Sequence, residues 1–156
     1  MNAEISAVDG AMLVDQAPDG MIFADRDGVI RVWNPAAERI FGYAAEAAIG
    51  RNLDIIIPEN LREAHWTGYE RALAAGDTKY RGQSLPTKAL KADGSQIYVE
   101  LSFAIVHGGS GEVVGAMAQA RDITERFERD RAMRRRLREL EKASDTAGDP
   151  RAELTP

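Results

Sequence analysis

The sequence predicts an α+β fold, in which a five-stranded antiparallel sheet carries helices on one face, with an N-terminal helix and a C-terminal amphipathic helix at its ends. Strand-like runs come first, at 20–33, short helical patterns fill 34–75, and segments with a period of two follow at 80–121. Strands on both sides of a block of helices, joined by short connections, are typical of an antiparallel sheet rather than of βαβ units.

The first strands form a predicted hairpin around an Asp-Gly turn. Residues 20–25 and 29–33 are largely apolar, and Asp27-Gly28 between them favours a tight turn. Ahead of the hairpin, the apolar stretch from Ala11 to Val14 predicts one N-terminal helix that ends near Pro18.

Capping residues then divide the helical region. Asn34 can accept backbone N–H bonds at a helix start, Pro35 is tolerated at the first helical position, and Gly42 favours the helix end. Gly76 is the expected C-cap of the longest helix. The predicted helices cover 34–42, 44–49, 52–57 and 59–75.

The remaining strands are predicted at 80–90, 96–106 and 113–121, because their side chains alternate and turn residues separate them. On the last strand Ala116, Ala118 and Ala120 alternate with Met117, so one face carries only small side chains and Met117 is expected to face away from it. If the small face points inward, it leaves a void that is costly unless filled. A bulky prosthetic group and bulky side chains from the helices are both possible fillers.

From Asp122 onward the pattern is helical, with a partial apolar stripe among Arg and Glu. The stripe consists of Ile123, Phe127, Met133, Leu137 and Leu140. We expect an N-terminal tail at 1–11, a folded domain at 12–122, an amphipathic helix at 123–143 and a disordered tail at 144–156.

Composition excludes several classes of function. The chain has 156 residues and no cysteine, which excludes disulfides, thiolate metal sites and flavin photochemistry through a cysteinyl adduct. No apolar run reaches the roughly 20 residues that a membrane span needs, so we expect a cytoplasmic protein without a membrane anchor. Basic residues near the C-terminus are interleaved with acidic ones, which argues against nucleic-acid binding. No catalytic motif is present, so we do not expect an enzyme.

Four motifs in order resemble those of PAS sensor domains. They are the run from Asn34 to Tyr43, Glu46 with Ile49-Gly50, the turn from Lys91 to Ser95, and the run from Arg121 to Glu125. The resemblance implies that the helices and the concave sheet face enclose a ligand pocket. It also implies that the Asp-Ile-Thr motif at 122–124 couples the last strand to an output helix.

One helical face then yields the candidate site. Leu61, Ala64, His65, Gly68, Tyr69 and Ala72 share a face of the 59–75 helix. His65 is therefore expected to point inward, beside a recess left by the small Ala64 and Gly68. A neutral imidazole there is suited to ligating iron. The alternative is a core histidine bonded to a backbone carbonyl, which is the commoner fate of a lone histidine.

The run Pro58-Glu59-x-x-Arg62-x-x-His65 is similar to the haem-ligating helix of the PAS domains of rhizobial oxygen-sensor kinases. The resemblance implies haem b with its iron on His65. The other residues placed by the resemblance and the small strand face are Tyr69, Arg71 and Lys79 near the propionates, Leu85, Leu101 and Phe103 on the distal side, and Ala118 in the pocket wall. Leu85 stands where the family has a distal arginine, so we expect an apolar distal pocket that favours carbon monoxide or nitric oxide over oxygen.

The resulting hypothesis is a haem b sensor of a diatomic gas (oxygen, carbon monoxide or nitric oxide) or of redox state. It would signal through a homodimer made by the terminal helices or through a separate signalling protein. One alternative is a haem-free PAS interaction or dimerisation module, its core filled by side chains or by a small organic ligand. Another is a flavin-binding redox sensor.

Overall fold

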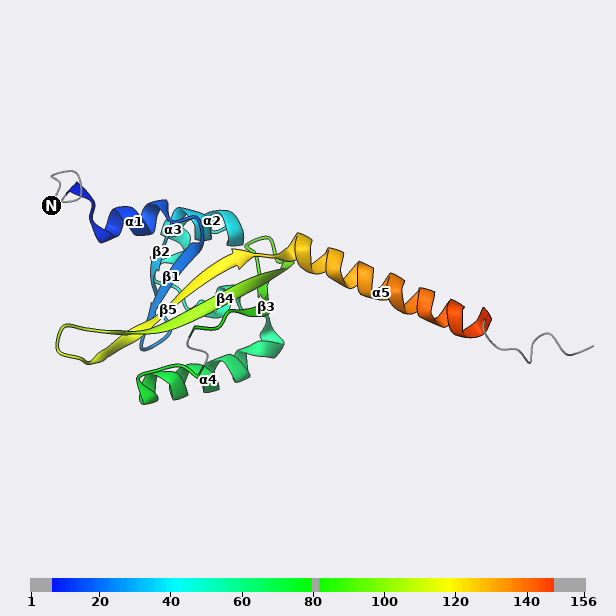
Figure 1. Cartoon of the computed structure of the whole chain (residues 1–156). Coiled ribbons are helices and arrows are strands. Elements are labelled where there is room, and N and C mark those ends of the chain that lie inside the picture. The colour runs from blue at the N-terminus through cyan, green and yellow to red at the C-terminus, as the bar shows by residue number, and fades with distance from the viewer. Residues whose placement is uncertain (1–6, 80–81, 148–156) are drawn as a thin grey trace, which may run out of the picture. The chain divides into compact units, whose positions relative to one another are not determined.

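The computed structural model describes residues 7–79 and 82–147, and the chain divides into two units, 1–123 and 124–156. The first unit holds the sheet and most helices (Figure 1). Its elements are α1 (Gly10–Gln16), β1 (Gly20–Asp25), β2 (Ile30–Trp33), α2 (Pro35–Phe41), α3 (Ala45–Ala48), η2 (Leu53–Ile56), η3 (Glu59–Leu61), α4 (Arg62–Ala75), β3 (Leu85–Leu90), β4 (Gln96–His107) and β5 (Val113–Asp122).

The strands form the predicted five-stranded antiparallel sheet, in the order β2-β1-β5-β4-β3. The expected start of the third strand at residue 80 is not what the structure gives, since β3 begins at Leu85. Gly82 adopts a left-handed φ of 72°, which makes a turn and delays the strand. Residues 80 and 81 lie outside the described residues.

Two helical segments differ in type from the prediction. The segment expected as a helix at 52–57 is the 3₁₀ turn η2, and the 59–75 helix opens with the 3₁₀ turn η3 before α4. Pro58 separates them and has no N–H to donate. In the segment before it, Ile57 bonds back to the Asp54 carbonyl, three residues earlier, which is the 3₁₀ pattern.

Asn34 caps α2 as predicted, and it also joins this helix to α1 and β1. Its side-chain oxygen accepts the N–H groups of Ala37 at 3.0 Å and Met21 at 2.8 Å, and its amide donates to the carbonyls of Val14 and Asp19. The side chain is buried with all these bonds made, so burial of this polar group carries little penalty.

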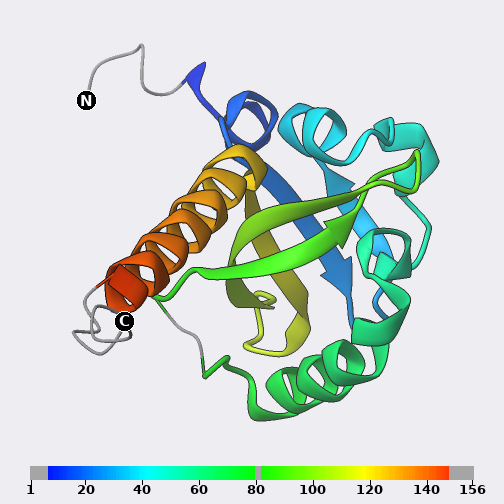
Figure 2. The ribbon, with the colours of Figure 1, turned by 90° about the vertical axis from the view of Figure 1, so that its right-hand side faces the viewer.

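The core lies between the inner sheet face and the segment from α2 to α4. Figure 2 shows this segment running around one side of the sheet. Buried side chains from both layers meet there, including Ile22, Ile30, Phe41, Ala48 and Val99. The helices thus cover one face, which confirms the predicted architecture.

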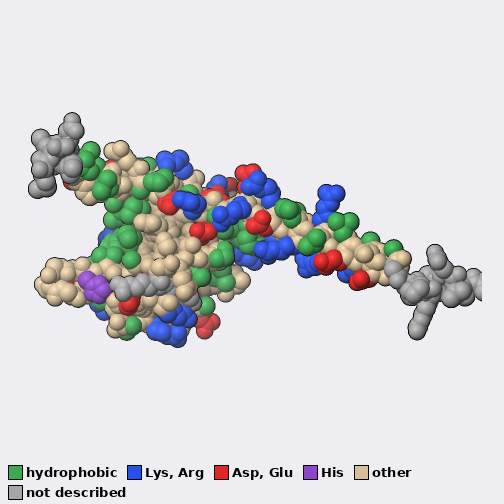
Figure 3. Space-filling model, viewed as in Figure 1, with side chains coloured by type: hydrophobic (Ala, Val, Ile, Leu, Met, Phe, Trp, Pro, Cys, Tyr) green, Lys and Arg blue, Asp and Glu red, His purple; other side chains and the backbone are tan. Residues whose placement is uncertain are grey.

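The second unit is α5 (Thr124–Ala147), a 24-residue helix. It continues past the predicted end at 143, so residues 144–147 are helical where a disordered tail was expected; residues 148–156 lie outside the described residues. Figure 3 shows hydrophobic and charged side chains interspersed along it, and Met133, Leu137 and Leu140 are exposed. No helix in the described part of the chain is both long and apolar enough to span a membrane.

Candidate functional site

Two adjoining cavities lie between α4 and the inner sheet face. The inner cavity, about 400 Å³, reaches from α4 to β3 and to the small residues of β5, whereas the outer cavity, about 800 Å³, lies along α4 toward its C-terminal end. Both volumes fall in the range of roughly 300–1,000 Å³ that is usual for ligand pockets. The side chains lining both cavities are Ala64, His65, Tyr69, Phe103 and Ala116.

His65 lies where the two cavities meet. Its Nδ1 atom is covered by protein and has no hydrogen-bond partner among the described residues. Burial lowers the pKa of His65, an effect that the carboxylate of Asp54 partly opposes. The imidazole is therefore neutral near pH 7. The alternative of a core histidine bonded to a backbone carbonyl does not hold.

Trp66 fastens the same helix to two neighbouring segments. Its indole N–H donates to the Asp54 carboxylate of η2 at 2.7 Å, and its ring packs edge-on against His65 with centroids 4.7 Å apart. The ring also covers Gly28 so closely that a Cβ built there would overlap Trp66 Cη2. Trp66 therefore fixes the position of His65 relative to the β1–β2 turn.

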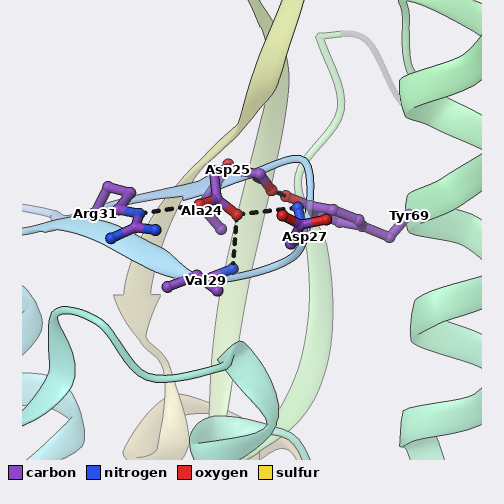
Figure 4. A network of polar contacts seen from close by, with 6 residues as sticks. All are labelled: Ala24, Asp25, Asp27, Val29, Arg31 and Tyr69. Carbon is purple, nitrogen blue, oxygen red and sulfur yellow. Dashed lines mark hydrogen bonds and ion pairs between the residues drawn. The ribbon is translucent and has the colours of Figure 1, made fainter.

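Tyr69 makes a second connection to that turn (Figure 4). Its hydroxyl donates to the carbonyls of Asp25 at 2.6 Å and Ala24 at 3.2 Å. Burial, aided by the negative charge of Asp25, raises the pKa of Tyr69 to about 12. The hydroxyl is thus protonated at physiological pH and already engaged with the backbone, rather than pointed at the mouth of a pocket.

The turn itself is held by Asp25. Its carboxylate accepts the backbone N–H groups of Asp27 and Val29 and pairs with Arg31 at 2.9 Å. Burial acts to raise the pKa of Asp25, but the bonds from Val29, Arg31 and Asp27 outweigh it and the pKa is lowered. Tyr69 of α4 therefore bonds to a hairpin end that Asp25 holds in place.

The opposite wall is the inner sheet face, where the predicted stripe of small residues lies. Ala118 pairs with Ile22 and Phe103, and these side chains line the inner cavity together. Met117 pairs with Phe23 on the alternating face, although it too borders the inner cavity. The alanines therefore leave space that the helices do not fill.

The structure places all the predicted site residues around these cavities. Arg71 and Lys79 line the outer cavity, whereas Leu85, Leu101 and Ala118 line the inner one. His65, Tyr69 and Phe103 border both. Within 7–79 and 82–147 no three His, Asp or Glu side chains gather into a metal-binding group. Among the predicted site residues, His65 is therefore the side chain that would ligate a metal at these cavities.

Sequence reasoning missed three contributors. They are Trp66 and Asp54, which are not among the predicted site residues, and Thr87 of β3, which lines the inner cavity. The contacts of Trp66 and Asp54 join segments far apart in sequence, which local patterns do not reveal. Alternation of Leu85, Thr87 and Ala89 along the strand could have identified Thr87.

Comparison with known proteins agrees with this geometry. A protein-family model described as PAS fold matches residues 14–128. The chain is 31% identical over 103 residues to the oxygen sensor protein DosP of Escherichia coli, covering 65% of this chain and 13% of DosP. It is 32% identical over 108 residues to the sensor protein FixL of Bradyrhizobium diazoefficiens, covering 69% of this chain and 21% of FixL. The match thus spans about a fifth or less of either relative.

A solved structure described as an RNA-binding Light-Oxygen-Voltage receptor is also similar. It has a TM-score of 0.62 and 26% sequence identity, over 83% of this chain and 38% of that one. The same architecture therefore occurs in oxygen sensors and in a light-oxygen-voltage receptor. The side chains at the cavities must therefore indicate which kind of ligand this chain binds.

Proposed function

This chain belongs to the PAS family, and on that premise we propose that it is a haem b-binding sensor of a diatomic gas, with His65 as the axial ligand of the iron. The observation that carries the proposal is the buried, unpartnered Nδ1 of His65 at the boundary of two cavities. A buried polar atom without a partner costs about 1–3 kcal/mol. Because Nδ1 is covered by protein, haem would have to be ligated through the other ring nitrogen, Nε2, of the side chain that lines both cavities.

The inner cavity supports a bulky apolar occupant. The cavity is not fully enclosed, and a bulky apolar ligand that displaces water from it would bury apolar surface of its own and of the lining, at about 25 cal/mol per Å². Its walls are mostly aliphatic or aromatic, including Ile22, Phe41, Leu53, Val99 and Leu101, which suits a porphyrin face better than trapped water.

The outer cavity supports the anionic edge of the same group. Arg71 and Lys79 line it together with the carboxylates of Glu63 and Asp77. Guanidinium and ammonium groups bind carboxylates such as the haem propionates. Tyr69 is not proposed as a propionate donor here, because its hydroxyl already donates to the Ala24 and Asp25 carbonyls. Its ring instead forms part of the wall between the cavities.

The residues of this chain then have distinct tasks. Burial keeps His65 neutral, Trp66 and Asp54 orient its helix, and the aliphatic sheet wall excludes water from the gas side. When bound, haem supplies an iron centre that takes up the gas.

Signal output is proposed to pass through the sheet. β5, which carries the inner-cavity alanines, ends at Asp122, and α5 begins at Thr124. We expect the protein to sense the gas in the cytoplasm and not to catalyse a reaction itself. It would pass the signal on through homodimer contacts or to a separate signalling protein. Exposed Met12 and Leu13 on α1, and Met133 and Leu137 on α5, support dimer contacts through these helices.

Absorption spectra of the purified protein in ferric, ferrous and carbonmonoxy states test the proposal. Wild type reconstituted with hemin is expected to show a Soret band that shifts with each state. His65→Ala should lose that spectrum, whereas His107→Ala, which removes the other histidine at an exposed position, should retain it. A colourless protein that does not take up hemin would overturn the proposal and favour the haem-free interaction module. A yellow protein would indicate a bound flavin.

A further inference from the structure

One hydroxyl stands out on the sheet wall of the inner cavity. The residues Leu85, Thr87 and Ala89 alternate with the exposed Pro86 and Lys88 along β3, so they share the inner face. Thr87 pairs with Val99 of β4, whose side chain is fully buried on that face. Thr87 is itself among the residues that line the cavity.

The Thr87 hydroxyl has no hydrogen-bond partner in the described ranges, 7–79 and 82–147. Unlike His65 Nδ1, the Thr87 oxygen is not completely covered by protein atoms. Its oxygen is therefore accessible from the space that it borders. A hydroxyl can donate one hydrogen bond and accept others.

The surroundings make this hydroxyl distinctive. The inward side chains that β1, β4 and β5 contribute to the same cavity are apolar, including Ile22, Val99, Leu101, Phe103 and Ala118. Tyr69 has already committed its hydroxyl to backbone carbonyls. Lys88 of β3 also lines this cavity, but it alternates to the exposed face of the strand. A polar atom of a ligand that approaches the inner face of the sheet therefore meets the Thr87 hydroxyl.

We propose that Thr87 is a specificity-determining residue that donates a hydrogen bond to the gas in the inner cavity and favours oxygen over carbon monoxide. This inference rests on the proposed haem function. Oxygen gains negative charge when it binds ferrous iron, and carbon monoxide gains much less, so a donor stabilises oxygen selectively. The expectation of a wholly apolar distal pocket, drawn from Leu85, is thereby replaced.

The test uses the hemin-reconstituted, reduced full chain and measures dissociation constants for oxygen and carbon monoxide by absorption titration. Thr87→Val keeps the shape and β-branching but removes the hydroxyl, and Thr87→Ser keeps the hydroxyl. One net hydrogen bond is worth about 1 kcal/mol, so Thr87→Val should weaken oxygen binding roughly three- to tenfold and change carbon monoxide binding little. Thr87→Ser should stay near wild type.

Ser102→Ala is the matched control, because Ser102 pairs with Gln119 on the alternating face of the sheet and does not line either cavity. It should leave both constants unchanged. The infrared C–O stretching frequency of the carbonmonoxy protein is a second readout, since a donor near the ligand oxygen lowers it. Thr87→Val should raise this frequency, and a merely structural role of Thr87 would not.

The outcomes separate the two proposals. An intact Soret band with an unchanged oxygen to carbon monoxide ratio in Thr87→Val overturns the role of Thr87 and leaves the haem function standing. Absence of a Soret band in wild type overturns both. An equal loss of both gases in Thr87→Val also contradicts selective donation, because it indicates a steric or folding effect.

Discussion

The two walls of the inner cavity are built on different principles. The α4 wall is fixed by polar contacts, because Trp66 bonds to Asp54 and Tyr69 bonds to the β1 carbonyls, and it leaves one imidazole nitrogen unpaired. The sheet wall has small and aliphatic residues and is held by its own strand ladder.

This difference indicates a division of work. The helix wall sets the position and protonation state of the ligating group, and the sheet wall provides space and selects what fits. Changes on the helix side should therefore alter stability and orientation together. Changes on the sheet side should alter ligand size and gas preference while the fold persists.

The largest expected effect is at Gly28, where the helix wall meets the hairpin. Its φ is 77°, and an added Cβ would overlap the Trp66 ring. We expect Gly28→Ala to reduce the free energy of unfolding by about 2–5 kcal/mol, which combines left-handed strain and overpacking. Urea unfolding measures this change.

Gly50→Ala is the control, because Gly50 has a φ of 91° with nothing within 4 Å of the added Cβ. Only the strain of roughly 1–2 kcal/mol should remain there. Equal losses at the two glycines would mean that the contact of Trp66 with the turn does not constrain α4.

On the sheet side, Ala118→Phe should fill the inner cavity. Ala118 borders it directly, and a bulky ring there competes with any ligand at a cost of about 1–3 kcal/mol. Hemin binding should weaken about tenfold or more, with folding retained by circular dichroism. Gln119→Leu, at an exposed position on the other face, should not affect binding; a similar loss there would show that the cavity is not the site.

Trp66→Phe separates the indole bond from the ring contacts. It removes the 2.7 Å bond to Asp54 but keeps an aromatic ring beside His65. Because Asp54 is partly exposed, we expect a loss of about 1 kcal/mol in unfolding free energy. The Asp54→Asn variant, which keeps an acceptor, should lose less, and the opposite order would argue against this bond as the anchor.

A smaller effect is expected from pH. Since burial lowers the pKa of His65 from 6.5, the unfolded chain binds a proton at this residue at higher pH than the folded chain does. Stability should therefore decline as pH falls through 6.5. The pH dependence of urea unfolding should be shallower in His65→Gln than in wild type, while His107→Gln should match wild type. An identical slope in all three proteins would place the imidazole in water.

Local signals were sufficient for most of the fold. The Asn34 cap, the Asp27-Gly28 turn and the alternation of β5 each depend on neighbours in sequence, and the structure confirms them. The 3₁₀ form of η2 and the helical residues 144–147 were missed, because weak propensity at helix ends does not fix length. The inward face predicted for α4 from spacing holds for His65 and Tyr69, which are half-buried, but Ala64 and Gly68 are exposed and the buried residue of the helix is Leu73.

The polar anchoring of the site was not predictable in the same way. Trp66 reaches Gly28, and Tyr69 reaches Ala24 and Asp25, only after the hairpin and α4 have packed together. Such contacts depend on tertiary distances that periodicity does not encode. The family resemblance, together with the spacing on α4 and β5, indicated which residues approach the cavities, but not which hydrogen bonds they make.

Rescue of His65→Gly by imidazole tests the central claim most directly. If the His65 side chain is the ligand that holds haem at these cavities, His65→Gly should lose the Soret spectrum of wild type, and free imidazole should restore it by occupying the vacated space. If His65→Gly takes up hemin with the wild-type spectrum in the absence of imidazole, haem is held elsewhere and the account is wrong.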